Sequence, residues 1–114
     1  MNENNKRNVD RNHLMPLKIE AIYQDRHRKY LRGTAKNISI NGIYIETPYT
    51  REYGEIIHIS LVGSYMKKII GVEGKVIHCE PGKGMGIEFV DQDNSEIKEL
   101  IRIIKMQDQA SLLS

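Results

Sequence analysis

The feature that most constrains the fold is a two-residue period of apolar side chains, repeated over short segments and then replaced by a helical period. Six segments have it, and they are predicted as strands at residues 17–23, 30–40, 43–47, 55–63, 66–80 and 85–90. Alternate side chains of a strand point to opposite faces, so each segment can bury one face. Six short strands without an intervening helix predict an all-β fold, a six-stranded antiparallel β-barrel or sandwich.

The period changes to that of a helix after residue 90. The apolar residues there are spaced three and four apart and form one stripe: Ile97, Leu100, Ile101 and Ile104. Asp93, followed three residues later by Glu96, is a possible capping box. We therefore expect a helix within residues 91–107 that packs against the sheet or a partner. Residues 108–114 form a tail, whose two leucines either extend the helix or fray.

Size and composition narrow the class of protein. The chain has 114 residues, enough for one domain, and its formal charge of +2 is too small for a protein that binds nucleic acid by overall charge. Its one cysteine, Cys79, excludes an intrachain disulfide, and no segment has the roughly 20 apolar residues of a membrane span. We expect a cytoplasmic protein with no membrane insertion, in which any anion site is local.

The first 14 residues differ in composition from the rest of the chain. Residues 1–14, MNENNKRNVDRNHL, are rich in asparagine and cations and lack apolar periodicity, so they are predicted to form a flexible arm ahead of a domain at 15–107. Arg7 and Arg11 are separated by three residues, and Lys6 precedes the first of them. Guanidinium groups bind phosphate oxygens in bidentate fashion, and they also bind the O6 and N7 edge of guanine.

A second group of polar residues lies in the segment KNISINGIYIE, residues 36–46. Asn41-Gly42 is a favoured pair for a two-residue type I′ hairpin turn. Asn37 and Ser39 would then share one face of the preceding strand, opposite the two isoleucines that alternate with them. Because the turn does not require these two polar side chains, they are candidate ligand-binding groups.

Arg7-x-x-x-Arg11 followed by Asn37-x-Ser39-x-x-Gly42 resembles the two-part signature of the PilZ domain family, bacterial receptors for cyclic di-GMP. The segments GIYIET, YGEIIHISL and GKVIHCEPGKGMGIEFVD and the final amphipathic helix look like the successive PilZ strands and C-terminal helix, so the resemblance covers nearly the whole chain. It implies a six-stranded antiparallel β-barrel of PilZ type with a C-terminal α-helix. It also implies binding of cyclic di-GMP, without a further cofactor.

The resemblance assigns roles to residues of both motifs. Arg7 and Arg11 would clamp phosphates and guanine edges as the arm folds over the ligand. Asn37 and Ser39 would bind guanine and phosphate from the barrel, and Gly42 would keep the turn open. The family has aspartate or asparagine at the first hairpin position, and the amide of Asn37 offers a different contact to guanine than a carboxylate would.

Two further residues are assigned by the same resemblance. Lys6 stands at the position linked to whether one ligand or a stacked pair is bound, and a basic residue there favours the pair. His78 lies near the segment where some PilZ proteins carry an aromatic residue that stacks on guanine. The arm's movement would act as a conformational switch read by an unidentified downstream protein, in motility, biofilm or polysaccharide control by analogy.

Other classes of function remain open at this point. The four histidines and Cys79 have no partners at a spacing typical of catalysis or metal binding, so we expect neither an enzyme nor a metal site. A small β-barrel that binds single-stranded nucleic acid would group its aromatic residues on one surface, whereas the six tyrosines are dispersed along the chain. A PilZ-like interaction module without ligand binding is the third alternative.

Overall fold

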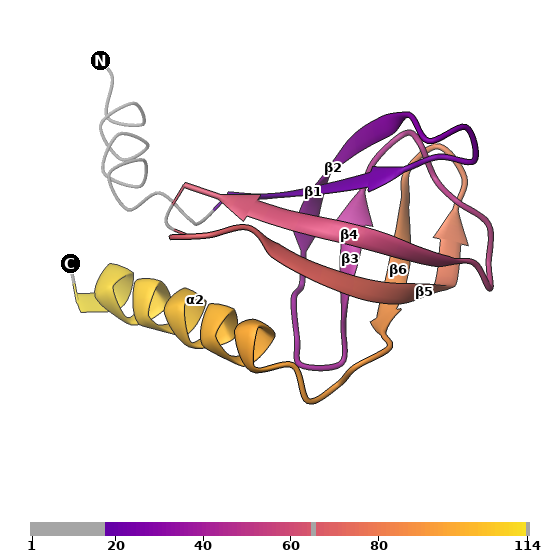
Figure 1. Cartoon of the computed structure of the whole chain (residues 1–114). Coiled ribbons are helices and arrows are strands. Elements are labelled where there is room, and N and C mark those ends of the chain that lie inside the picture. The colour runs from indigo at the N-terminus through magenta and orange to yellow at the C-terminus, as the bar shows by residue number, and fades with distance from the viewer. Residues whose placement is uncertain (1–17, 65, 114) are drawn as a thin grey trace, which may run out of the picture.

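The computed structural model of the protein is a closed barrel with one helix, and it describes residues 18–64 and 66–113 (Figure 1). The elements are β1 (Ile19–Gln24), β2 (Tyr30–Lys36), β3 (Gly42–Glu46), β4 (Ile56–Gly63), β5 (Ile70–Glu80), β6 (Gly84–Phe89) and α2 (Ser95–Leu113). The strand order is β1-β2-β3-β6-β5-β4, with every neighbouring pair antiparallel. The predicted six-stranded antiparallel β-barrel with a C-terminal helix is confirmed. Over the described ranges, the structure has no helix whose length and apolar character would suit a membrane span.

Antiparallel pairing around the barrel places the connections at two opposite ends. We call one the helix-covered end: it comprises the start of β1, the loop 37–41, the connection between β4 and β5, and α2 (Figure 1). We call the other the far end: it comprises the connections 25–29, 47–55 and 81–83. The distinction matters because the loop with Asn37 and Ser39 and the start of the described chain both lie at the helix-covered end.

The barrel interior is apolar. Its buried members come from all the strands except β2 and from α2: Ile19, Ala21, Tyr23, Ile43, Ile45, Ile57, Ile59, Leu61, Ile70, Val72, Val76, Met85, Ile87, Phe89, Ile97 and Leu100. The alternation that predicted the strands is the alternation that fills this core, as in β1, where Ile19, Ala21 and Tyr23 are buried in turn. Burial of aliphatic side chains, worth roughly 25 cal/mol per Å² of apolar surface, is therefore the main force that closes the barrel.

Helix α2 closes the helix-covered end through the predicted stripe. Ile97 and Leu100 are buried in the core cluster, and Ile101 and Ile104 pack against it. The predicted capping box is wrong: the Oδ1 atom of Asn94 accepts hydrogen bonds from the N–H groups of Glu96 (2.8 Å) and Ile97 (3.1 Å), so Asn94 is the N-cap. The helix also continues through residues 108–113, so the predicted tail extends it.

Strand β5 also differs in detail from its prediction. The sequence predicts a strand over residues 66–80 with interruptions at Gly71 and Gly74, but β5 begins at Ile70 and runs through both glycines. Its register shift lies later, between Val76 and His78. A bulge of this kind adds one residue to one strand, which here turns the following side chains of β5 relative to those of β6.

Candidate functional site

The described chain begins at the helix-covered end of the barrel, the end that also carries the loop 37–41. Glu20 of β1 pairs with Thr34 of β2 in an antiparallel register, and this is the last pair between the two strands before β2 ends at Lys36. The loop 37–41 follows directly. Lys6, Arg7 and Arg11 lie outside the described residues, so their predicted roles stay predictions. The register nevertheless shows that the segment carrying them joins the barrel at the end where the second motif is found.

The loop does not have the predicted two-residue turn. β2 ends at Lys36 rather than continuing to residue 40, and β3 begins at Gly42, so the connection is a five-residue loop. A type I′ turn needs positive φ at both central residues, but neither Asn41 nor Gly42 has it. The residue with positive φ is instead Asn37, at 51°. Asparagine tolerates the left-handed region better than most residues, so Asn37 ends the strand by its backbone conformation.

Ser39 shapes the loop as well as presenting a hydroxyl group. Its Oγ atom accepts hydrogen bonds from the N–H groups of Asn41 (3.2 Å) and Gly42 (3.3 Å), while its own N–H donates to the carbonyl of Gly42 (2.9 Å). The expectation that the hairpin does not need Ser39 is therefore wrong. Asn37 and Ser39 are both exposed, and within the described chain the Asn37 amide makes no hydrogen bond. With respect to the described residues, that amide is a candidate contact for a ligand.

Gly42 is required by close packing rather than by an open turn. It pairs with Glu88 of β6, and a Cβ atom at its position would lie 2.1 Å from the carbonyl oxygen of Ile87. A backbone atom cannot yield to such a contact as a flexible side chain can. Gly42 therefore fixes the approach of β3 to β6 directly beside the loop.

A platform lies on the outer surface of β3, β6 and β5, next to this loop. We define it as Tyr44, Gly86 and His78, which are aligned across the three strands by the register. Gly86, which has no side chain, stands between Tyr44 and His78 in the register. His78 is exposed, and strand spacings of about 4.8 Å and a rise of about 3.3 Å per residue place its Cα atom about 12 Å from that of Gly42.

Tyr44 is the platform residue that the sequence reasoning missed. Its hydroxyl donates a hydrogen bond to Oε1 of Glu80 at 2.5 Å, and its ring lies over Gly84, where a Cβ atom would lie 2.5 Å from the ring carbon Cζ. The hydrogen bond to the Glu80 carboxylate raises the pKa of Tyr44 to about 12. The phenol is therefore neutral near pH 7. The sequence does contain a signal for it: Tyr44 is two residues after Gly42, so the two residues face the same side of the strand.

The remaining titratable candidates have structural surroundings. His58 faces outward as predicted, and its Nε2 atom lies 3.3 Å from Oε2 of Glu73 on the neighbouring strand. Cys79 is half-buried and packs against the core. In the part of the chain that the structure describes, no three His, Cys, Asp or Glu side chains are grouped as a metal site would need.

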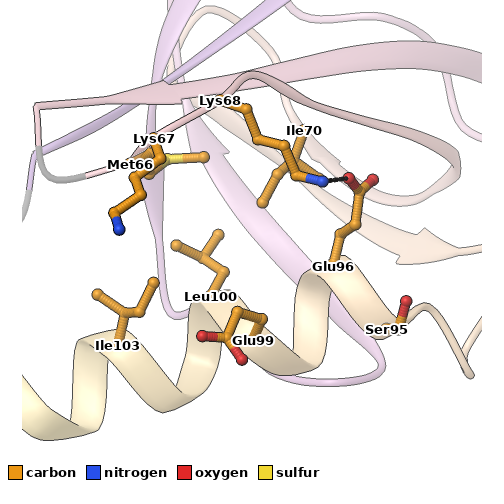
Figure 2. Close-up of a pocket in the computed structure, with 9 residues that line it drawn as sticks. All are labelled: Met66, Lys67, Lys68, Ile70, Ser95, Glu96, Glu99, Leu100 and Ile103. Carbon is orange, nitrogen blue, oxygen red and sulfur yellow. Dashed lines mark ion pairs between the residues drawn. The ribbon is translucent and has the colours of Figure 1, made fainter.

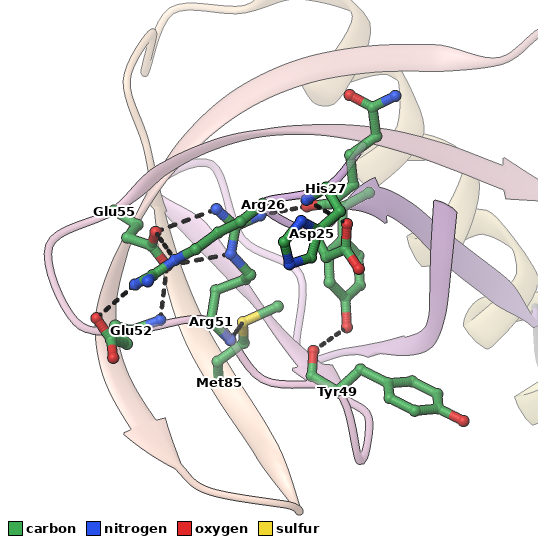
Figure 3. A network of polar contacts seen from close by, with 10 residues as sticks. Asp25, Arg26, His27, Tyr49, Arg51, Glu52, Glu55 and Met85 are labelled. Carbon is green, nitrogen blue, oxygen red and sulfur yellow. Dashed lines mark hydrogen bonds and ion pairs between the residues drawn. The ribbon is translucent and has the colours of Figure 1, made fainter. Parts of the chain in front are cut away.

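A polar network lies at the far end and joins its loops to one another (Figure 3). The guanidinium of Arg51 binds both carboxylate oxygens of Glu55 at 3.1 Å and also donates to the carbonyl of Gln24. Arg26 pairs with Glu52 at 2.7 Å. The Arg51 side chain holds the pKa of Glu55 below its usual value. These charges are already paired, so the network closes the barrel rather than offering a ligand site.

Comparison with known proteins agrees with this geometry. The family model described as PilZ domain matches residues 4–106, which includes both motifs and the platform. The chain belongs to the PilZ domain family. No curated protein sequence matches the chain.

Two solved PilZ structures are similar in fold. The PilZ domain with c-di-GMP of YcgR from Escherichia coli is 12% identical, with a TM-score of 0.63 over 82% of this chain and 84% of that one. The PilZ domain of CeSA from a cellulose-synthesizing bacterium is 14% identical, with a TM-score of 0.53 over 82% of this chain and 96% of that one. At these identities the likeness concerns the fold.

Proposed function

We propose that this PilZ domain binds cyclic di-GMP between its N-terminal segment and the surface formed by the loop 37–41 and the platform. The observation that carries the proposal is that β1 begins at the end of the barrel where β2 ends, so the chain ahead of β1 joins the barrel at the same end as the loop with Asn37 and Ser39. Family membership and the c-di-GMP named for the YcgR domain support the choice of ligand.

The roles of the individual residues follow from their chemistry. Arg7 and Arg11 bind phosphate oxygens and guanine edges through charge-assisted bonds, with Lys6 adding a cation that favours a stacked pair of ligands. The amide of Asn37 and the hydroxyl of Ser39 bind from the loop. Tyr44 and His78 offer ring faces on the platform, where a guanine can stack.

The free-energy contributions to binding indicate that both halves of the site are needed, the N-terminal segment and the loop with the platform. Ordering about six residues of the N-terminal segment costs about 1–2 kcal/mol each, while a hydrogen bond to a charged group contributes about 1.5–3 kcal/mol. A micromolar complex needs a net binding free energy of about −8 kcal/mol. Two arginines scarcely offset the ordering of their own segment, so the loop and platform must supply contacts of their own.

The proposal extends to signalling. The N-terminal segment exposes different surfaces when free and when folded over the ligand, and a downstream protein that binds only one of them reads the ligand concentration. No bond is made or broken, so the function is that of a receptor in second-messenger signalling rather than of an enzyme.

The test is calorimetric titration of the full chain with cyclic di-GMP. Loss of two charged groups, each worth about 1.5–3 kcal/mol, predicts that Arg7→Ala/Arg11→Ala weakens binding at least about 100-fold. The matched control is Arg102→Ala/Lys105→Ala, which removes the same charge from the exposed side of α2 and leaves affinity unchanged. Unaltered affinity in the arginine variant overturns the proposal, as does a chain that binds a short single-stranded oligonucleotide in preference to cyclic di-GMP.

A further inference from the structure

An apolar groove of about 700 Å³ lies between α2 and the connection that follows β4 (Figure 2). Met66 and Ile70 line it from the barrel side, and Leu100 and Ile103 line it from the helix. Ile70 and Leu100 are also core residues, so the groove borders the core. Lys68 and Glu96 form an ion pair of 2.7 Å that bridges the barrel side and the helix.

The described chain begins beside this groove. A Cβ atom on Gly63 would lie 3.0 Å from the carbonyl oxygen of Lys18 and 3.1 Å from the sulfur of Met66. The first described residue and a lining residue of the groove therefore flank the same point at the end of β4. Any segment that precedes Lys18 leaves the barrel within a few ångströms of the groove.

The sequence immediately before Lys18 has the chemistry to fill an apolar groove. Leu14, Met15 and Leu17 are three apolar residues within four positions, after a segment that is mostly polar. An extended chain spans about 3.3–3.6 Å per residue, so Met15 can reach about 10 Å from Lys18. Leu17 and Met15 also continue the alternation of Ile19 and Ala21, whose side chains face the barrel interior that α2 covers.

We propose that the groove is the docking site for residues 14–17 of this same chain, with Met15 against Leu100 and Ile103. A segment tethered at the rim binds as if present at millimolar concentration, so a few apolar contacts suffice to hold it. A second copy of the chain would need far more surface, because stable interfaces bury about 1,600 Å² in total. The tether and the size of the groove both favour the chain's own segment.

Docking of this segment also bears on ligand binding, a consequence that rests on the proposed function. With residues 14–17 held on the barrel, only the residues ahead of them need to be ordered when Arg7 and Arg11 bind the ligand. A shorter free segment loses less conformational entropy. Docking in the groove thus raises the affinity for cyclic di-GMP, because it positions the N-terminal segment for the loop 37–41.

The experiment is disulfide trapping in the full chain with Cys79→Ser as background. Met15→Cys/Ile103→Cys is expected to form an intramolecular disulfide under mild oxidation at high dilution, since a disulfide needs its Cβ atoms about 3.5–4.5 Å apart. The matched control, Met15→Cys/Arg102→Cys, moves the helix cysteine to a neighbouring exposed position and should cross-link at least about tenfold more slowly. Peptide mass mapping identifies the bond, and far-UV circular dichroism confirms that each variant is folded.

The outcomes separate docking from ligand binding. Equal trapping at positions 102 and 103, or no trapping in a folded chain, overturns the proposal. A disulfide that forms when the two single-cysteine variants are mixed at micromolar concentration, in preference to the intramolecular one, assigns the groove to a second copy and also overturns it. Trapping without cyclic di-GMP binding supports docking while the proposed function fails. A disulfide-trapped protein that binds cyclic di-GMP with unchanged or higher affinity supports both docking and the proposed function.

Discussion

The two ends of the barrel are closed by different forces. At the far end, charged and polar side chains of the connecting loops pair with one another, as Arg51 does with Glu55 and Arg26 with Glu52. At the helix-covered end, apolar side chains of α2 fill the opening, and the loop beside it presents the amide of Asn37, which has no hydrogen bond among the described residues. Satisfied polar groups have no capacity left for a ligand. The comparison supports our proposal that ligand recognition belongs to the end where closure is apolar and the loop amide has no hydrogen bond among the described residues.

The largest expected effect on stability is at the helix-covered end. Leu100→Ala removes a side chain that is 1% exposed and leaves a cavity where α2 meets the barrel, so it should lower the free energy of unfolding by about 2–5 kcal/mol. Urea denaturation followed by circular dichroism measures this loss. Lys98→Ala, on the exposed side of the same helix, is the control and should change stability by less than about 0.5 kcal/mol. Similar values for the two variants would show that the helix does not close the barrel.

A smaller effect is expected where polar contacts close the far end. The hydroxyl of Tyr23, a residue that is 1% exposed, donates to the carbonyl of Tyr49 at 2.6 Å and lies 2.9 Å from Oγ1 of Thr47. Tyr23→Phe leaves these acceptors without that donor and should cost about 1–3 kcal/mol in unfolding experiments.

Ligand affinity distinguishes this change from damage to the site. Because Tyr23 reaches the far end, the folded Tyr23→Phe protein should bind cyclic di-GMP with unchanged affinity in calorimetry. Tyr30→Phe, at a residue that is 74% exposed, is the control for loss of a hydroxyl without loss of a buried contact. A marked fall in affinity for Tyr23→Phe would contradict the separation of the two ends.

The strands and the helix were predictable because their signal is local and repeated. Most of the β-strands show their alternation over several residues, so an error at one position does not change the result. The boundaries were less predictable, because single residues decide them: Asn37 ends β2 through a positive φ, and Asn94 rather than Asp93 caps α2. Asparagine and aspartate are about equally good caps, so the local sequence cannot choose between them.

The sequence predicted the two motifs of the candidate site, but it did not predict the platform beside them. Asn37 and Ser39 came from a spacing along the chain, but Tyr44 came to light only through its alignment with Gly86 and His78. This alignment depends on the register of strands that are distant in sequence. A turn motif such as Asn41-Gly42 does not determine that register. The predicted Asn41-Gly42 turn failed for a related reason, since the packing of Gly42 against Ile87 decides the path of the chain there.

A third prediction separates the backbone role of Asn37 from its side-chain role. Asn37→Ala places a residue with a Cβ atom and no local hydrogen bonding in the left-handed region, which should cost about 1 kcal/mol of stability. Asn37→Gly accepts the same φ of 51° without strain and should keep the stability of the wild type. Chemical denaturation of both variants tests the backbone role.

The glycine variant then tests the side chain. If the amide of Asn37 binds the ligand, calorimetry should show a comparable loss of cyclic di-GMP affinity for Asn37→Gly and Asn37→Ala, although only the alanine variant is destabilised. Wild-type affinity in Asn37→Gly would assign the residue to loop shape alone.

The prediction with the smallest expected effect compares two tyrosines whose pKa values are raised for different reasons. Burial raises the pKa of Tyr23, whereas the hydrogen bond to the Glu80 carboxylate raises that of Tyr44 to about 12. Glu80→Gln keeps an acceptor for Tyr44 but removes the charge, so in an ultraviolet titration of tyrosinate it should return the pKa of Tyr44 toward 10 and leave that of Tyr23 raised. Tyr44→Phe removes the assigned transition and is the control.

The sign of the effect on stability follows from the direction of the Tyr44 shift. Its pKa is higher in the folded chain, about 12, than the ordinary value of 10, so the folded state holds the proton more tightly. Its contribution is therefore fully present below pH 10 and is lost as the pH rises toward 12. Glu80→Gln should flatten the stability profile in this window, measured against the wild type. An unchanged profile together with an unchanged Tyr44 transition would mean that the Tyr44–Glu80 contact does not hold the platform ring over Gly84 in solution.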